Sequence, residues 1–142
     1  MRHFDRKYLF TMFEINIFAV LTATLVSMAV GLVWYSPWAC GNIWMKTVGL
    51  SNTDLERGVW HRFALGFVAQ GVLLVVLTNL FVQTHTVVPS HLLVVSVTLA
   101  VLAVQAGTVI WERKSFVYFL INGVYTSAVI VGGSAIVIYW PW

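Results

Sequence analysis

The sequence predicts an all-α integral membrane protein, a four-helix bundle with an interfacial segment between its first and second helices. All charged side chains lie in three short clusters, and the stretches 15–45, 63–111 and 115–142 contain none. A hydrocarbon core of about 30 Å takes roughly 20 helical residues to cross, so these stretches have room for one, two and one crossings. With 142 residues, 60% hydrophobic and 9% charged, the chain is too apolar for a soluble domain and has the size of one bundle.

The first membrane helix is expected over about residues 15–35 of a single transmembrane domain, 1–142. The preceding segment 2–14 mixes charges with aromatic residues, which is typical of a short helix lying at the membrane surface. A basic start followed by an apolar run imitates a secretory signal. The run is long enough to span the membrane, so we expect the segment to be retained.

The connection 36–62 is expected to lie at the membrane interface. It opens with Pro37, which ends the preceding helix and suits the first turn of another. Thr53 followed by Glu56 matches a capping box. A helix should therefore begin there and continue into the second span, at about 63–81.

The second half of the chain is predicted to form a helical hairpin. A charge-free turn at 82–90, which contains a proline, separates the second span from the third, at about 91–111. The turn 112–115 is so short that the fourth span, at about 116–139, must pack antiparallel to the third. This hairpin is the firmest contact that the sequence predicts.

The bundle should therefore have two faces. We call the side that holds 36–62 and 112–115 the connection face, and the side that holds the chain ends and 82–90 the terminal face. More basic residues lie on the connection face, which by the positive-inside rule places it in the cytoplasm and both termini outside, in a bacterial inner membrane. The connection face carries Lys46, Arg57, Arg62, Arg113 and Lys114, against Arg2, Arg6 and Lys7 on the other.

Aromatic residues gather at both faces, where an indole or phenol keeps an apolar body in lipid and a polar atom in water. We interpret them as interfacial anchors. Those of the connection face are Trp34, Tyr35, Trp38, Trp44, Trp60 and Trp111, and those of the terminal face are Trp140 and Trp142.

Small residues recur at helical spacing and predict close helix packing, because lipid offers little hydrophobic drive between helices. One stripe of four follows the first helix, and shorter ones follow the third and fourth. Since the fourth helix has two separate stripes, one of them is available to a neighbouring subunit. The stripes comprise Ala19, Ala23, Ser27 and Gly31; Ala103 and Gly107; Gly123 and Ser127; and Ala128 and Gly132.

One polar side chain in each span falls at the same expected depth, about 10–12 Å from the connection face at 1.5 Å per residue. These residues predict a polar layer across the bundle, widened by Thr98 and Thr126. Unpaired amides are costly in hydrocarbon, so they should turn inward and bond to one another, to backbone or to water. The layer either fixes helix register or binds a ligand, a lipid headgroup or an ion. Its members are Ser27, Gln70, Gln105 and Asn122.

The sequence offers little chemistry. The layer has no titratable member, which argues against proton-coupled or cation-coupled transport but leaves a passive path for a small neutral or lipid-like molecule. We find no zinc-ligand spacing, nucleophile elbow, phosphate loop or paired carboxylates, and we interpret His85 and His91 as turn residues rather than metal or haem ligands. Scattered basic residues argue against nucleic acid as a partner. No metal site is predicted, and the sequence leaves the cofactor unknown.

Several of these segments resemble the signature of a membrane family called domain of unknown function 1761. The resemblance implies a small four-helix membrane protein without an assigned activity, and it brings no catalytic or binding residue. The segment 2–14 departs from the family pattern, which suggests a partner specific to this chain. The matching segments are Gly31-Leu-Val-Trp-Tyr-Ser-Pro37 with Gly41, Trp44-Met-Lys46, Gly49-Leu-Ser51, Trp111-Glu-Arg-Lys114, and Phe119-Leu-Ile-Asn-Gly123 with Tyr125.

Together these features predict a non-enzymatic structural or accessory component of a membrane assembly, either a homo-oligomer or a subunit of a larger complex, surrounded by membrane lipids. The alternative is a protein that binds or passes a lipid-like or small neutral solute at the polar layer. A pocket lined by the layer residues would favour the alternative, and direct bonding in a dry core would favour the structural role. An enzyme acting on lipid ranks third, since it would need clustered acidic or histidine side chains.

Overall fold

The computed structural model describes residues 16–51, 53–54, 58–84 and 87–141, and this part of the chain is helical, without strands. The expected surface helix within 2–14 lies outside the described residues, as do Glu56, His85 and Trp142. Five helices are described: α2 (Ile17–Trp34), α3 (Gly41–Val48), α5 (Val59–Thr84), α6 (Ser90–Trp111) and α7 (Phe116–Ile138).

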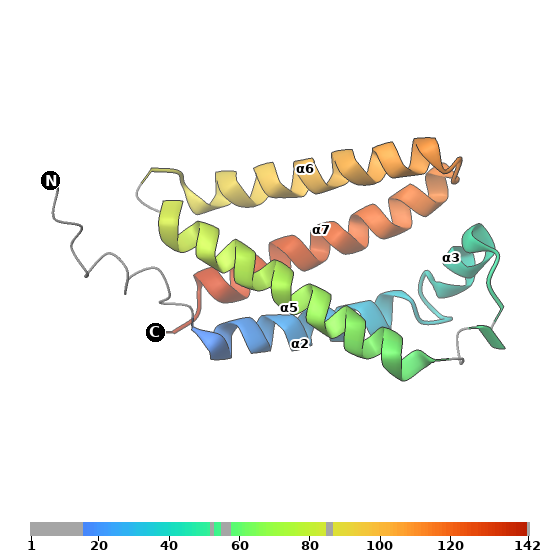
Figure 1. Ribbon diagram of the computed structural model, residues 1–142, viewed down its shortest axis with the longest axis horizontal. Helices are drawn as coiled ribbons and strands as arrows, with labels where there is room; N and C mark the ends of the chain where they lie inside the picture. Colours follow the sequence, from blue (N-terminus) through green and yellow to red (C-terminus); the bar gives the residue numbers. More distant parts are fainter. Residues whose placement is uncertain (1–15, 52, 55–57, 85–86, 142) are drawn as a thin grey trace, which may run out of the picture.

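The all-α membrane fold class is confirmed. Four of the described helices, all except α3, are long and apolar enough to cross a membrane. They run up and down the long axis of the molecule, so α3 and the α6–α7 turn lie at one end, while the start of α2 and the end of α7 lie at the other (Figure 1). These ends correspond to the connection face and the terminal face.

The second span is longer than expected. It begins at Val59 and ends at Thr84, whereas the charge-free pattern placed it at about 63–81. The helix expected to run from Thr53 into this span is not continuous, because Gly58 takes a left-handed φ of 68° directly before Val59. A charged residue such as Arg62 limits the hydrocarbon crossing but does not end a helix, so α5 extends beyond the apolar stretch on the connection face. The bounds of the other three spans differ from expectation by no more than two residues.

The helix of the interfacial connection, α3, begins at Gly41 rather than at Pro37. The residues between are held in a compact turn, in which the Ala39 and Gly41 amides donate to the Ser36 carbonyl at 3.1 and 3.0 Å. Gly49 ends α3 with a φ of 69°, a left-handed conformation that glycine adopts without a Cβ penalty.

Side-chain caps hold the starts of two spans. The Asn16 side chain accepts from the amides of Phe18 and Ala19 at 3.0 and 3.2 Å, and the Ser115 hydroxyl accepts from the Tyr118 amide at 3.1 Å. Each cap satisfies amides that the first helical turn leaves without a partner. The Ser115 cap sets the start of α7 directly after the turn from α6.

Helix α7 is the centre of the bundle. It packs most extensively against α2 and α6, and it also contacts α5 and α3. Helices α5 and α6 touch only slightly. Helix α6 therefore lies at the edge of the bundle beside α7 (Figure 1), and Val94 is its one buried residue.

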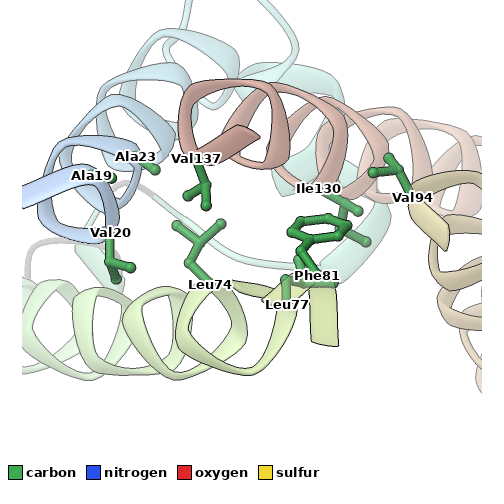
Figure 2. Packing of buried hydrophobic residues seen from close by; sticks show 9 residues of the cluster. All are labelled: Ala19, Val20, Ala23, Leu74, Leu77, Phe81, Val94, Ile130 and Val137. Atoms are coloured by element: carbon green, nitrogen blue, oxygen red, sulfur yellow. The ribbon is translucent and has the colours of Figure 1, made fainter. Parts of the chain in front are cut away.

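The apolar core lies in the terminal half of the bundle, where side chains from α2, α5 and α7 interdigitate and Val94 adds the edge of α6 (Figure 2). Leu74 is fully buried, and it lies so close to Gly133 that a Cβ there would approach its Cδ2 to 2.6 Å. The core consists of Ala19, Val20, Ala23, Leu74, Leu77, Phe81, Val94, Ile130 and Val137.

The small-residue stripes divide into inward and outward groups. Ala19, Ala23 and Ser27 are buried, as is Gly123, where an added Cβ would meet Leu102 at 3.1 Å. Ser127 is half-buried and donates to the carbonyl of its own helix at Gly123, 2.8 Å away. The inward group therefore lies where the helices of one chain meet.

The outward group lies on α6 and α7. Ala103, Ala128 and Gly132 are exposed, and a Cβ added at Gly107 or Gly132 would meet nothing within 4 Å. The described residues of this chain leave both positions uncovered. These two stripes are thus free to meet lipid or another protein.

Candidate functional site

Amides and hydroxyls from all four spans gather in the connection half of the bundle. We call this group the polar network, and define it as Tyr35, Gln70, Gln105, Asn122, Tyr125 and Thr126. Three of its members belong to one stretch of α7, so α7 receives polar contacts from α5, from α6 and from the end of α2. The network lies apart from the dry apolar core near the terminal face.

Asn122 joins α7 to the end of α2. Its Oδ1 accepts a 2.8 Å hydrogen bond from the Tyr35 hydroxyl, and its Nδ2 donates to the Tyr118 carbonyl at 2.8 Å. Next to it, the Trp34 indole donates to the Ile121 carbonyl at 3.1 Å. Both aromatic residues at the end of α2 are therefore tied to α7.

Gln70 joins α5 to α7. Its Nε2 donates to the Tyr125 hydroxyl at 3.2 Å, and the Tyr125 ring lies edge-on to Tyr35 with centroids 5.1 Å apart. The tyrosine fits because Gly31 has no side chain, and a Cβ there would lie 2.9 Å from the Tyr125 hydroxyl. Gly31 thus packs against the network rather than against a helix backbone.

Gln105 joins α6 to α7. Its Nε2 donates to the Thr126 hydroxyl at 2.8 Å. The Oε1 atoms of Gln105 and Gln70 are buried without a hydrogen-bond partner among the described residues. An unpaired buried acceptor is costly in a membrane, so each of these oxygens is a place where a donor would be stabilised.

The predicted layer is only partly brought together. Gln70, Gln105 and Asn122 all reach the same stretch of α7, but in the described part of the chain they bond to hydroxyl groups and backbone rather than to one another. Ser27 is buried, but no hydrogen bond of the described residues joins it to the three amides. It lies one helical turn beyond Gly31 toward the terminal face.

Three of the predicted anchors have an additional role inside the protein. Trp34 and Tyr35 use their polar atoms in bonds to α7, and Trp44 of α3 places its ring 5.3 Å from that of Tyr35, with its Nε1 buried and unpartnered in the described chain. An indole whose N–H is buried cannot serve the headgroup region, so Trp44 docks α3 on the bundle.

The remaining anchors differ in exposure. Trp38, Trp60 and Trp111 are exposed at the connection face. Trp140 is half-buried and packs against the apolar core at the terminal face, and Trp142 lies outside the described residues.

The turn that carries Tyr35 requires a glycine. A Cβ at Gly41 would lie 2.2 Å from the Tyr35 carbonyl oxygen, because the chain folds back on itself here. The Cys40 amide donates to the Trp34 carbonyl at 3.0 Å and closes the turn. This folded-back turn positions Tyr35 toward Asn122 and Trp44 toward Tyr35.

A partly open recess of about 180 Å³ lies between α6 and α7 beside the network. Polar and apolar side chains share its wall, and none of them carries a charge. It is lined by Gln105, Thr108, Val109, Tyr118, Phe119, Asn122 and Thr126.

Sequence reasoning did not assign Tyr118 or Tyr125 to the site. Both had a signal, because Tyr118 lies four residues before Asn122 and Tyr125 three after, which puts all three on one face of a helix. Of the tyrosines in the four spans, only Tyr35 has a predicted role, as an interfacial anchor. Inside a span, a tyrosine that shares a face with an amide is better interpreted as its hydrogen-bond partner.

The comparisons with known proteins give a family but no activity. A family model described as "Protein of unknown function (DUF1761)" matches residues 18–138. The chain belongs to the DUF1761 family. No curated protein and no solved structure matches it.

The DUF1761 match extends over all four spans, and two of the segments that carried the resemblance, 31–37 and 119–123, meet at the polar network. Trp34 and Tyr35 bond to Ile121 and Asn122, while Gly41 permits the turn between them and α3. Segments far apart in the sequence thus form one structural unit at the connection face. The segment 2–14 lies outside the DUF1761 match.

Proposed function

We propose that this protein is a non-enzymatic structural component of a membrane assembly, and that it associates with a second copy of itself through the outer face of α6. We further propose that it resides in a bacterial inner membrane with its connection face in the cytoplasm, because the sequence pattern assigns more Lys and Arg residues to that face.

The single observation that carries this proposal is the outer face of α6. Its four small residues follow one another at spacings of four, three and four, which puts them on one side of the helix over three turns. Ser96, Ala100 and Ala103 are exposed, and Gly107 has open space where a Cβ would be. Such a strip allows another helix to approach closely, which is how membrane helices associate.

The other contacts of α6 are few. Val94 is its one buried residue, and within the chain it packs on α7 far more than on α5. A helix that is needed only to complete the monomer would turn its small residues toward its own neighbours, as α2 does with Ala19 and Ala23. On α6 the small residues face away from the bundle.

The polar network supports a structural role as well. Its bonds between Tyr35 and Asn122, Gln70 and Tyr125, and Gln105 and Thr126 link four helices to one another. Such links fix helix register, and they leave α6 as a firm outer surface. A second copy is the partner that we favour, because a strip of small residues is self-complementary about a two-fold axis, the commonest symmetry of oligomers.

The test measures distances between copies in liposomes. A nitroxide label is attached at position 112 in the background Cys40→Ser, Glu112→Cys, and electron double resonance is recorded. We expect a defined distance between copies, lost in Ala103→Leu and kept in Val95→Leu, an exposed α6 residue that is not three or four positions from any member of the strip. An added leucine that faces lipid leaves the monomer intact, so a lost distance reports on the contact between copies. The same distance in all three proteins, or no defined distance in any of them, would contradict the proposal.

A further inference from the structure

We propose that the recess between α6 and α7 is a binding site for a small neutral group that carries several hydroxyls, either the headgroup of a polyol or sugar lipid or a free solute of the same chemistry. This site is separate from the assembly surface, because the small strip on the outside of α6 does not line it.

The recess descends from the membrane interface into the span. Thr108 lies four residues before Glu112 and Tyr118 three after Ser115, so both lie about 5–6 Å from the turn at 1.5 Å per residue. Thr126, eleven residues from Ser115, lies about 16 Å deep on the same scale. The polar side chains of the recess thus range in depth from the first turn of each helix to about 16 Å toward mid-membrane.

The wall of the recess has unused hydrogen-bonding capacity. Gln105 uses its Nε2 on Thr126 and keeps a buried Oε1 without a partner, and the Tyr118 hydroxyl makes no hydrogen bond within the described chain. Asn122 keeps a second Nδ2 proton and a second lone pair on Oδ1 after its bonds to Tyr118 and Tyr35. The wall therefore offers both donors and acceptors, which matches hydroxyl groups, since each hydroxyl both donates and accepts.

The size and charge of the recess limit its ligand. A cavity of about 150 Å³ holds a molecule the size of benzene, so the 180 Å³ here admits a ring or polyol of similar size. No lining residue is charged, so an ion would lose its hydration without gaining a counter-charge. A neutral polyol loses less hydration free energy than an ion, and it regains hydrogen bonds from the wall.

Two probes distinguish the sources of this chemistry. In one arm, the full chain is placed in nanodiscs of phosphatidylcholine with a minor fraction of monogalactosyl diacylglycerol, and native mass spectrometry measures which lipid stays bound. In the other arm, free galactose is added to phosphatidylcholine nanodiscs, and saturation-transfer NMR measures its contact with the protein. Each is repeated for Gln105→Leu, Thr126→Val and the control Thr98→Val.

Thr98 is a matched control because it lies on α6, donates to its own helix at Val94, and does not line the recess. We expect one of the two probes to bind, with binding reduced about fivefold by Gln105→Leu and by Thr126→Val and unchanged by Thr98→Val, as expected for the loss of one hydrogen bond. Circular dichroism melts identify any variant that fails to fold, and Thr126→Val keeps the shape of its side chain.

The probe whose binding falls in the two recess variants identifies the ligand. Binding of the galactolipid would assign a lipid headgroup, and binding of galactose would assign a free solute. The proposal is overturned if neither probe binds, or if a probe binds equally well to wild type and to the folded recess variants. Binding that Thr98→Val weakens as much as Thr126→Val would also overturn it, because the contact would then lie elsewhere on α6.

Discussion

Each amide of the polar network has a hydroxyl partner on another helix. Gln70 meets Tyr125, Gln105 meets Thr126, and Asn122 meets Tyr35. The amides do not meet one another because α5 and α6 touch only slightly, and both reach α7 instead. The tyrosines, with their long side chains, make these contacts possible across the helix interfaces.

Tyr35→Phe is expected to lower the free energy of unfolding by about 1 kcal/mol, because it removes a hydrogen bond to Asn122 while keeping the ring. Asn122→Leu should lower the free energy of unfolding further, since it also removes the bond to the Tyr118 carbonyl. A double-mutant cycle in bicelles measures the coupling. The control is Tyr139→Phe, whose ring is exposed at the terminal face. Additive effects at positions 35 and 122 would show that the two side chains are not paired.

Outside the spans, Ser51 and Asp54 form a reciprocal cap. The Ser51 amide donates to Asp54 Oδ2 at 3.0 Å, the two side chains also bond, and the Asp54 amide donates weakly to the Ser51 hydroxyl at 3.4 Å. The predicted pair was Thr53 with Glu56, and Glu56 lies outside the described residues. Asp54 now has the acidic role that the sequence pattern gave to Glu56.

The bonds from Ser51 lower the pKa of the Asp54 carboxyl, with a smaller contribution from Arg62. Because the folded pKa lies below the unfolded one, the cap stabilises the folded chain above the unfolded pKa, and this stabilisation is lost as the pH falls through the folded pKa. Carbon NMR titration of Asp54 should give a pKa below the ordinary value of about 3.9, and Ser51→Ala should raise it. A wild-type pKa at or above the ordinary value would refute the cap.

At the scale of whole helices, the position of a small residue decides what it contributes. Gly31 on α2 faces Tyr125, whereas Gly66 on α5 faces only the flexible end of Met28, at 3.8 Å. Both are helical glycines in the spans that pack against each other. An added methyl group should therefore change the free energy of unfolding in opposite directions at the two positions.

Gly31→Ala is expected to destabilise the protein by about 1–3 kcal/mol, since the methyl group displaces the Tyr125 ring. Gly66→Ala should stabilise it by about 0.5–1 kcal/mol, because alanine loses less entropy in a helix and has room here. Unfolding free energies of the two variants provide the comparison. Equal effects of the two substitutions would mean that Gly31 does not pack against Tyr125.

Most of the fold was predictable from the sequence, because charge-free length alone fixes a membrane crossing. The bounds of α2, α6 and α7 follow from this rule. The start of α5 did not, since a helix can extend past the hydrocarbon into the interface. Gly58, with its left-handed φ of 68° directly before Val59, marks the boundary that the charge-free rule missed. The turn before α3 was also missed, because its shape depends on Gly41 folding against the Tyr35 carbonyl, a contact that propensity does not report.

The sequence predicted which amides belong to the candidate site but not which residues they bond to. The depth argument selected Gln70, Gln105 and Asn122, which do reach one stretch of α7. It could not select their partners, because depth says nothing about which faces meet. The inward turn of Trp44 was hidden for the same reason, since an indole near an interface has two stable positions, one in the headgroups and one against its own protein.

For the molecule as a whole, four crossings put both described ends on the same face (Figure 1). The orientation that we propose gives an expected result for fusions in a bacterial host: alkaline phosphatase fused after the C-terminus should be active, and a fluorescent protein fused there should be dark. A phosphatase inserted in the α6–α7 turn should be inactive. The opposite pattern would place the connection face outside.

The outer face of α6 is the surface through which we propose that copies of this protein assemble. The most direct test is native mass spectrometry of the full chain, extracted from its own membrane with a polymer that keeps surrounding lipid. We predict a discrete species with at least two copies for the wild type and for Val95→Leu, and a monomer for Ala103→Leu. A wild-type monomer that carries only lipid would contradict the account.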